Sequence, residues 1–373
     1  MMYDYLIVGC GFAGATLAER IANELGKSVL IVDRRNHVGG NAYDFTDRNG
    51  IRVGKYGAHI FHTNSAKIWN YVARFAEFNG YVHTVDAFID GQLYPLPLNL
   101  QTINKFFGTD LTEQTVEAFL KSKSLKIKNP KTAEEMVLSK VGRELYEAFY
   151  QNYTIKQWGL HPRELDASVT ARLPIRFNED CRYFTDRWQG IPREGYENLF
   201  RNLLNFPGIE VLLNTSFRLV ESAVQFDKLI FTGPIDEFFD YGFGKLPYRS
   251  LSFEFERFER EYFQHKAVVN YPNEQFFTRI VEYKYFYQQK SPYTTISKEY
   301  PCWNDQEPYY PVPNPANREV YGRYRKMADK LKSVYFCGRL ATYKYLNMDQ
   351  CIGQALSLFE KQISRQEKAR LAV

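Results

Sequence analysis

The residues best suited to chemistry near the start of the chain are three glycines and an acid. Gly9, Gly11 and Gly14 are spaced as G-x-G-x-x-G after an apolar run and before a helical pattern, and Asp33 ends the next apolar run. Here the first glycine makes a tight turn, the second lets backbone approach a pyrophosphate, and the third allows close helix–strand packing. The helix N-terminus offers N–H groups to phosphates, and Asp33 would accept hydrogen bonds from an adenosine ribose. The sequence therefore predicts a dinucleotide site, with Phe12 inside its loop.

The residues after this acid indicate which dinucleotide is bound. Arg34 begins an R-x-x-x-x-G-G pattern that continues through Gly39, Gly40 and Asn41. The extension resembles that of FAD-containing oxidases and their relatives, in contrast to NAD dehydrogenases. Near the C-terminus, Arg339 follows a strand and a Cys-Gly pair, where it would meet the pyrophosphate. We therefore expect FAD as the cofactor.

Regular elements must hold these residues in place. Apolar runs predict buried strands over residues 3–8 and 28–32, and the pattern between them predicts a helix over 12–25, which together make a βαβ unit. Another buried strand over 334–338 and a closing helix over 349–366 return the chain to the same lobe. We expect a discontinuous Rossmann-like FAD domain that draws on both ends of the chain.

The middle of the chain changes its periodicity twice. Apolar residues recur at helical spacing over 101–150, which predicts an inserted helical domain, whereas 251–300 alternates like an antiparallel sheet. Residues 161–176 lack periodicity and predict a mobile active-site loop. The remaining predicted elements are a helix over 66–78, a short strand pair over 88–99 and strands within 208–232. The expected domains are FAD-binding (1–80, 205–240, 330–373), helical (98–165) and sheet or substrate (81–97, 170–204, 241–329).

Composition restricts the possible functions. The 373 residues are 45% hydrophobic, enough for a large core, and the net charge of +5 favours an anionic small molecule. No apolar run resembles a signal peptide or a membrane span, so we expect a cytoplasmic protein without membrane or nucleic-acid partners. The five cysteines form no C-x-x-C pair, which argues against a zinc site. The 28 tyrosines are more than a core needs and suit a polar pocket.

Seven separated segments carry a more specific resemblance. They are GKYGAHIFHT (54–63), YTIKQWG (153–159), ARLPIRF (171–177), YRSLSFE (248–254), RIVEYKYF (279–286), EPYYPV (307–312) and GRLATYKYLNMDQ (338–350). In this order they resemble prokaryotic UDP-galactopyranose mutases over nearly the whole chain. The resemblance implies interconversion of UDP-galactopyranose and UDP-galactofuranose without net redox, in which N5 of reduced FAD attacks the anomeric carbon and UDP leaves. It also implies a homodimer with a role in cell-surface polysaccharide biosynthesis.

The same resemblance assigns roles to individual residues. Arg172 and Arg279 would bind the diphosphate, because arginine's fork suits phosphate oxygens, and His59 would lie near the flavin ring. The further residues implied to bind the cofactor are Ile60, Met348 and Asp349. Those implied to bind the substrate are Phe149, Tyr150, Tyr153, Thr154 and Trp158 around the uridine, Tyr183, Tyr310 and Tyr345 as hydroxyl donors, and Asn270 and His83. Asn347 stands where the family often has an acid, which puts any role for a carboxylate there in doubt.

Three alternatives stay open on the sequence alone. An FAD-dependent oxidoreductase of the amine-oxidase type shares the N-terminal signature and would need no paired diphosphate arginines. A non-catalytic module that binds a flavin or a nucleotide sugar would keep the pockets without turnover. The same mechanism on UDP-N-acetylgalactosamine would need room and a polar partner for the acetamido group near the flavin.

Overall fold

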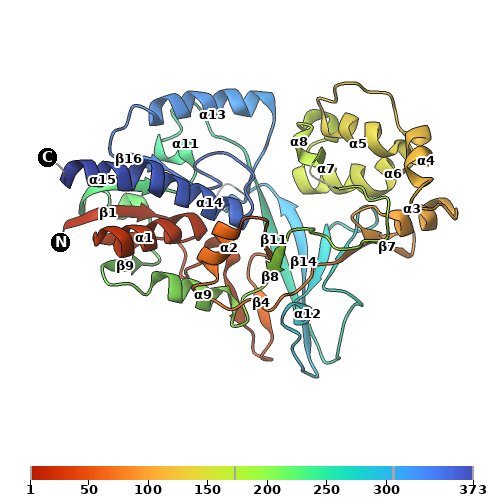
Figure 1. The fold of residues 1–373 in the computed structure, drawn as a ribbon, viewed down its shortest axis with the longest axis horizontal. Coiled ribbons are helices and arrows are strands. Elements are labelled where there is room, and N and C mark those ends of the chain that lie inside the picture. The colour runs from red at the N-terminus through yellow and green to blue at the C-terminus, as the bar shows by residue number, and fades with distance from the viewer. Residues whose placement is uncertain (1, 172–173, 305–306, 372–373) are drawn as a thin grey trace.

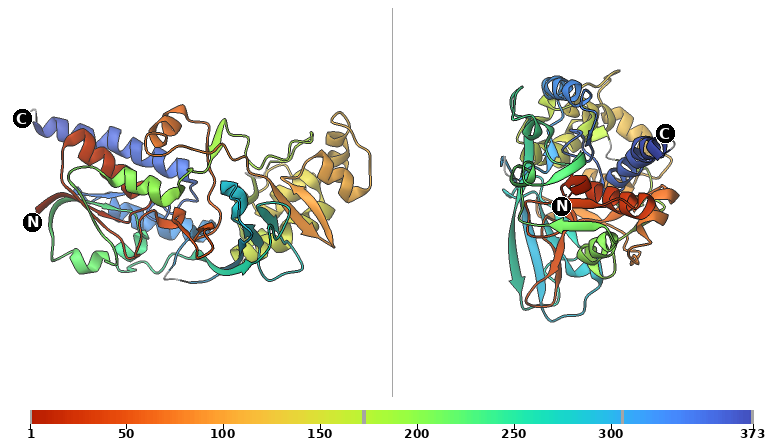
Figure 2. Two further views of the ribbon diagram at one scale, coloured as in Figure 1. Left: turned by 90° about the horizontal axis from the view of Figure 1, so that it is seen from below. Right: turned by 90° about the vertical axis from the view of Figure 1, so that its left-hand side faces the viewer.

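The structure is a computed structural model that describes residues 2–171, 174–304 and 307–371. The chain forms an elongated molecule with a layered α/β lobe at one end, a helical lobe at the other and a sheet between them (Figure 1). Both termini lie at the α/β end (Figures 1 and 2). Within the described residues, no helix is both long enough and apolar enough to cross a bilayer.

A five-stranded parallel sheet forms the core of the α/β lobe, in the order β16-β10-β1-β2-β9. Its central strand β1 carries the buried residues Tyr5, Leu6 and Ile7, as expected for a parallel strand covered on both faces. Helix α1 packs beside α14 on one face (Figure 2). The elements are β1 (Met2–Val8), α1 (Phe12–Leu25), β2 (Val29–Val32), β9 (Ile209–Leu212), β10 (Gln225–Phe231), β16 (Val334–Phe336) and α14 (Met348–Leu358).

A seven-stranded sheet forms the middle of the molecule, in the order β15-β11-β14-β13-β12-β6-β7. Its strands are β6 (Val85–Ile89), β7 (Gln92–Leu96), β11 (Tyr248–Phe258), β12 (Val268–Asn270), β13 (Arg279–Glu282), β14 (Thr294–Cys302) and β15 (Tyr310–Pro311). The neighbours are antiparallel except β12 and β6, which run parallel. The sheet is therefore mixed where the sequence predicts only antiparallel strands, because a hairpin from before the helical insertion joins its edge.

The helical lobe lies above one end of this sheet (Figure 1). Its helices are α3 (Leu100–Phe107), α4 (Val116–Lys123), α5 (Ala133–Val141), α6 (Arg143–Leu145), the π-helical turn η2 (Tyr146–Gln151) and α7 (Asn152–Trp158). Side chains fix where two of them begin, since Asn99 caps α3 and Thr132 makes a capping box with Glu135 on α5. The predicted fold class is confirmed: a Rossmann-like unit is combined with helical and sheet parts.

Short elements connect these parts. They are η1 (Gly40–Ala42), β3 (Asp44–Thr46), β4 (Arg52–Gly54), β5 (Phe61–Thr63), α2 (Ala66–Val72), η3 (Pro162–Glu164), α8 (Ser168–Ala171), β8 (Trp188–Gly190), α9 (Gly195–Leu204), α10 (Phe217–Val220), α11 (Ile235–Phe238), α12 (Lys284–Tyr287), α13 (Pro315–Ala328), η4 (Phe359–Ile363) and α15 (Ser364–Leu371).

Three of these elements differ from the sequence prediction. Helix α2 ends at Val72, before the predicted residue 78, and the chain beyond it pairs with another segment through a bridge from Phe78 to Pro192 and hydrogen bonds between Asn79 and the backbone of Ile191. The closing helix is interrupted by the π-helical turn η4. The segment predicted as a loop over 161–176 contains η3 and α8, and the side chain of Asp166 accepts a hydrogen bond from the backbone N–H of Ser168 at the start of α8. Its residues 172–173 lie outside the described residues.

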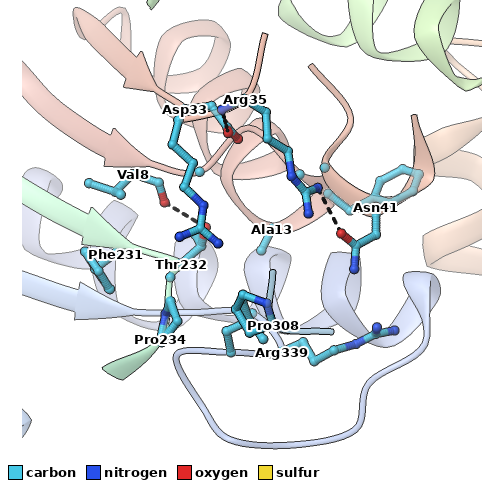
Figure 3. A pocket seen from close by; sticks show the side chains of 18 of the residues that line it. Val8, Ala13, Asp33, Arg35, Asn41, Phe231, Thr232, Pro234, Pro308 and Arg339 are labelled. Atoms are coloured by element: carbon cyan, nitrogen blue, oxygen red, sulfur yellow. Dashed lines mark hydrogen bonds between the residues drawn. The ribbon is translucent and has the colours of Figure 1, made fainter. Parts of the chain in front are cut away.

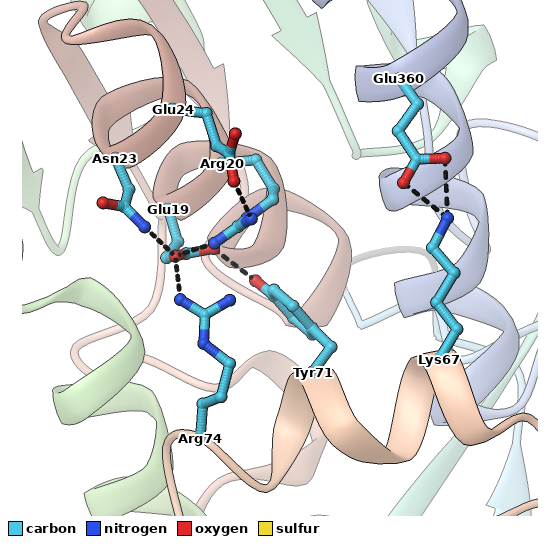
Figure 4. A network of polar contacts seen from close by, with 8 residues as sticks. All are labelled: Glu19, Arg20, Asn23, Glu24, Lys67, Tyr71, Arg74 and Glu360. Carbon is cyan, nitrogen blue, oxygen red and sulfur yellow. Dashed lines mark hydrogen bonds and ion pairs between the residues drawn. The ribbon is translucent and has the colours of Figure 1, made fainter.

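A buried carboxylate joins α1 to α2 in the α/β lobe (Figure 4). Glu19 is fully buried and accepts hydrogen bonds from Arg20, from the Tyr71 hydroxyl at 2.9 Å and from Arg74 at 3.3 Å. A buried charge is tolerated only where it is paired and hydrogen-bonded. This network therefore holds α2 against the helix that opens the glycine loop.

Replacing Glu19 by leucine is expected to lower the free energy of unfolding by about 3 kcal/mol, because it leaves Arg20 buried without its main counter-ion. Glu24→Gln is the matched control, since the Glu24 side chain is half exposed and contacts the same arginine. Urea unfolding followed by circular dichroism measures both variants. Equal stabilities for the two variants would contradict the structural role of Glu19.

Candidate functional site

The glycine loop between β1 and α1 is shaped by close backbone approaches. Gly9 has a φ of +99°, and a Cβ there would lie 2.1 Å from the Thr232 hydroxyl. A Cβ on Gly14 would lie 2.0 Å from the Gly9 carbonyl oxygen. Gly11 is the N-cap of α1 and provides no side-chain cap. The first N–H groups of α1 are therefore left for an anionic ligand, as a dinucleotide site requires.

Asp33 supports this loop directly. One carboxylate oxygen accepts a hydrogen bond from the backbone N–H of Cys10 at 2.8 Å, and the other accepts from the N–H of Arg35 at 2.9 Å. The carboxylate also lines the pocket that the loop opens into. It thus holds the loop in shape, in addition to the ribose contact expected from the sequence.

One pocket collects most of the predicted cofactor residues (Figure 3). The predicted residues that line it are Gly9, Gly11, Phe12, Asp33, Arg34, Gly39, Gly40, Asn41, His59, Arg339 and Met348. Three do not: Gly14 packs against the loop backbone, Ile60 lies in the core, and Asp349 accepts a hydrogen bond from the N–H of Gln350. One part of the pocket wall was not predicted from the sequence. It is formed by Thr232 and Pro234 after β10, and by Pro308 and Tyr309.

Arg339 connects this pocket to a second group of side chains. Its guanidinium donates to the carbonyl of Leu346 at 2.6 Å and to that of Tyr309 at 3.3 Å. It also lies 5.3 Å from the ring centroids of both Tyr310 and Tyr345. These two rings stack with centroids 5.1 Å apart. The predicted hydroxyl donors Tyr310 and Tyr345 therefore lie next to the dinucleotide pocket, on the other side of Arg339.

His59 is half-buried on the pocket wall. Its Nδ1 lies 3.2 Å from the Gly57 carbonyl oxygen, so this nitrogen carries the proton and Nε2 is left as an acceptor. Burial, opposed by this hydrogen bond, lowers the pKa of His59 to about 4. The imidazole is therefore neutral at physiological pH.

Arg279 is the centre of the second group. From β13 it hydrogen-bonds to the Tyr153 hydroxyl and lies 3.4 Å from Glu299 on β14. Burial disfavours its charge, but Tyr153 and Glu299 outweigh this effect and its pKa stays well above the usual value. Burial raises the pKa of Glu299, and the nearby Arg279 opposes that shift. The guanidinium is a permanent cation facing tyrosine hydroxyls.

Other predicted substrate residues surround this arginine. Asn270 pairs with Arg279 across β12 and β13 and is buried. The backbone N–H of Tyr183 donates to the His83 carbonyl at 2.7 Å, and burial, with Arg279 and His62 nearby, lowers the pKa of His83 to about 3. Trp158 lies 6.4 Å from Tyr310, between ring centroids. Burial, with Tyr183 nearby, raises the pKa of the Tyr150 hydroxyl.

Some predicted residues lie elsewhere. Phe149 packs against Tyr94 and Phe106 in the core of the helical lobe, so its ring forms part of that core. Thr154 is buried in α7. Arg172 lies outside the described residues. Asn347 caps α14 through a capping box with Gln350, a local role that an amide performs without charge.

Glu299 is a site residue that sequence reasoning missed. Its carboxylate faces Gly57, where a Cβ would lie 2.6 Å from Oε1, so it touches the segment that carries His59. The alternation of Thr295, Ser297 and Glu299 along β14 puts them on one buried face. That alternation was visible in the sequence, but the register that sets Glu299 opposite Arg279 was not.

The chain matches two family models and is similar to known proteins over nearly its whole length. Residues 148–345 match the family model for UDP-galactopyranose mutase, and residues 7–75 match that for an NAD(P)-binding Rossmann-like domain. A probable UDP-galactopyranose mutase from Klebsiella pneumoniae is 40% identical over 97% of this chain and 95% of its own length. A dTDP-fucopyranose mutase from Escherichia coli is 42% identical over 95% of this chain and 97% of its own length.

The fold has a close counterpart among solved structures. A crystal structure of reduced UDP-galactopyranose mutase superimposes with a TM-score of 0.77 at 16% identity, covering 97% of this chain and 96% of the other. The matches to the mutase and Rossmann-like family models point to a flavin cofactor. Together with the family model and the two relatives, these results show that the chain belongs to the UDP-galactopyranose mutase family, whose members are isomerases.

Proposed function

We propose that the protein interconverts UDP-galactopyranose and UDP-galactofuranose with reduced FAD. The observation that carries this proposal is Arg279, a half-buried cation near several tyrosines, beside a dinucleotide pocket. Arg339 lies between the two groups and contacts both. A sugar nucleotide whose diphosphate meets Arg279 would place its sugar towards the flavin.

The pocket residues fit FAD. The close approaches at Gly9 and Gly14 and the uncapped N-terminus of α1 provide the pyrophosphate cradle. When bound and reduced, FAD supplies a nucleophilic nitrogen, N5, for the anomeric carbon, so that UDP leaves and ring size changes without net redox. His59 would offer its neutral Nε2 as a hydrogen-bond acceptor in this pocket.

The protein's own residues would stabilise the departing diphosphate. A guanidinium and hydroxyl donors that are held in place before the reaction cost no reorganisation as charge develops. Arg279, Tyr153 and Tyr310 supply such donors, and Glu299 helps to orient Arg279. We assign Arg172 as the second arginine on the strength of the family resemblance.

The nucleoside would bind between the helical lobe and the sheet. Tyr150 and Tyr153 would offer ring area from one side, with the buried Trp158 on the same helix as Tyr153, and stacking suits a flat base. Asn270 would accept a hydrogen bond from the nucleotide on the other side, because its Oδ1 is buried without a hydrogen-bond partner in the described part of the chain. A buried unpaired acceptor is costly, and a ligand donor would satisfy it.

A second candidate substrate is dTDP-fucopyranose. The Escherichia coli relative named for that substrate is 42% identical over almost the whole chain. We rank UDP-galactopyranose first, because the family model and the Klebsiella pneumoniae relative are named for that substrate. The homodimer, the cytoplasmic location, the role in cell-surface polysaccharide biosynthesis and the domain bounds are further parts of the proposal, taken from the sequence.

The test is an assay in which the dithionite-reduced and the oxidised protein are each given three sugar nucleotides as substrates. UDP-galactofuranose, dTDP-fucofuranose and UDP-N-acetylgalactosamine are incubated separately, and products are separated by chromatography. We expect conversion of UDP-galactofuranose by the reduced protein, with the flavin spectrum unchanged after many turnovers. Equal activity of the oxidised protein, or stoichiometric reduction of the flavin by substrate, would show the proposal to be wrong.

Arg279→Ala is expected to lower kcat/KM by roughly 100-fold or more, since it removes a donor to the developing charge. The flavin content of the purified variant should match wild type, because Arg279 does not line the dinucleotide pocket. Arg48→Ala, at an exposed position, is the control and should retain full activity. Near-normal turnover of Arg279→Ala would refute the diphosphate assignment.

A further inference from the structure

Helix α7 carries Tyr153, Thr154 and Trp158, and a cation from the sheet holds its C-terminal end. Arg249 on β11 is buried and donates to the carbonyls of Gln157 and Lys156, both at 3.0 Å. The last carbonyls of a helix have no partner within it and attract positive charge. Arg249 thereby fastens the C-terminal end of α7 to the middle sheet.

A second cation points the opposite way, from α7 to the sheet. Lys156 donates to three carbonyls of the turn between β12 and β13, those of Tyr271, Gln275 at 2.9 Å and Phe277 at 3.2 Å. An ammonium has three donors and here it has three acceptors. Burial lowers the pKa of Lys156 to about 8, with Glu274 opposing the shift, so the ammonium occupies this position at neutral pH.

The same turn is held to the helical lobe at another point. Asn273 donates to the carbonyl of Ala148 at 3.1 Å and accepts from the side chain of Asn152 at 3.1 Å. These bonds come from η2 and the first turn of α7, one helical turn from Lys156. The turn over residues 271–278 is thus bound along the same helix that carries Tyr153.

The position of this turn matters because of the residues at its two ends. Asn270 is the last residue of β12 and Arg279 the first of β13. Both belong to the proposed nucleotide site, whereas Lys156 does not line the dinucleotide pocket. A shift of the turn relative to α7 would move Arg279 away from the Tyr153 hydroxyl that it contacts.

We propose that Lys156 is a positioning residue for the reaction. By gathering three carbonyls of the β12–β13 turn onto α7, it sets Asn270 and Arg279 against Tyr153, so that the two halves of the nucleotide site keep one geometry. The inference rests on the proposed function, because it concerns the binding of a nucleoside diphosphate at that site. It adds a residue that contacts neither the substrate nor the flavin.

The experiment replaces Lys156 by methionine, which keeps the length of the side chain and removes its donors. Lys121→Met is the matched control, since Lys121 is exposed on α4 in the same lobe. We expect Lys156→Met to weaken UDP binding, measured by titration calorimetry on the flavin-loaded protein, and to raise KM by about tenfold, because small misplacements of a binding group are costly. We expect kcat to fall as well, because Arg279 is proposed to donate to the charge that develops as UDP departs.

The flavin absorbance spectrum separates positioning from general stability. A merely structural role would reduce the yield of flavin-loaded protein and leave the UDP affinity of the loaded fraction at the wild-type value, and that result would overturn the proposal. Asn273→Ala breaks the second attachment of the turn without touching Lys156, and should weaken UDP binding in the same direction by about fivefold, the value of one hydrogen bond.

If Lys156→Met does not fold, Asn273→Ala decides: wild-type UDP affinity in that variant overturns the inference. Failure of the proposed function is recognised separately, because wild-type protein would then neither bind UDP nor convert a UDP-sugar. Wild-type protein that binds and converts, with variants that do so equally well, contradicts only the role of Lys156.

Discussion

The geometry of the proposed substrate site depends on one half-buried guanidinium, that of Arg279. Arg279 lies between Glu299 on the next strand and Tyr153 on a helix of another lobe. Its partner Glu299 is buried, and a buried carboxylate needs a paired cation, so the two strands and the helix that carries Tyr153 meet at one point. The same requirement leaves a permanent positive charge facing a group of hydroxyls, which is what a diphosphate needs.

This constraint explains how three separate parts of the fold make one site. The parallel sheet supplies the glycine loop and the strand end at Arg339, the middle sheet supplies Arg279 and Glu299, and the helical lobe supplies Tyr153 and Trp158. Glu299 also meets the segment at Gly57 that carries His59. The Glu299 carboxylate thereby links the position of the Arg279 guanidinium to the wall of the dinucleotide pocket.

The parts that the sequence predicted well are those governed by local rules. The loop at Gly9 needs a positive φ and close approaches that only glycine permits, so its spacing is readable without a structure. The partner of Arg279 was not readable, because it depends on the register between β13 and β14. Phe149 was assigned to the uridine wall, whereas helical spacing turns its ring into the core of the helical lobe. The parallel pairing of β6 with β12 was not readable either, because it joins strands far apart in the sequence, with Val85 opposite Val268.

The most direct test of this account is a crystal structure of the reduced protein with UDP-galactopyranose. The account predicts that phosphate oxygens lie within hydrogen-bonding distance of the Arg279 guanidinium, with the Tyr153 hydroxyl still beside it and the sugar directed towards His59. A diphosphate bound elsewhere, with Arg279 still paired only with Glu299 and Tyr153, would contradict it.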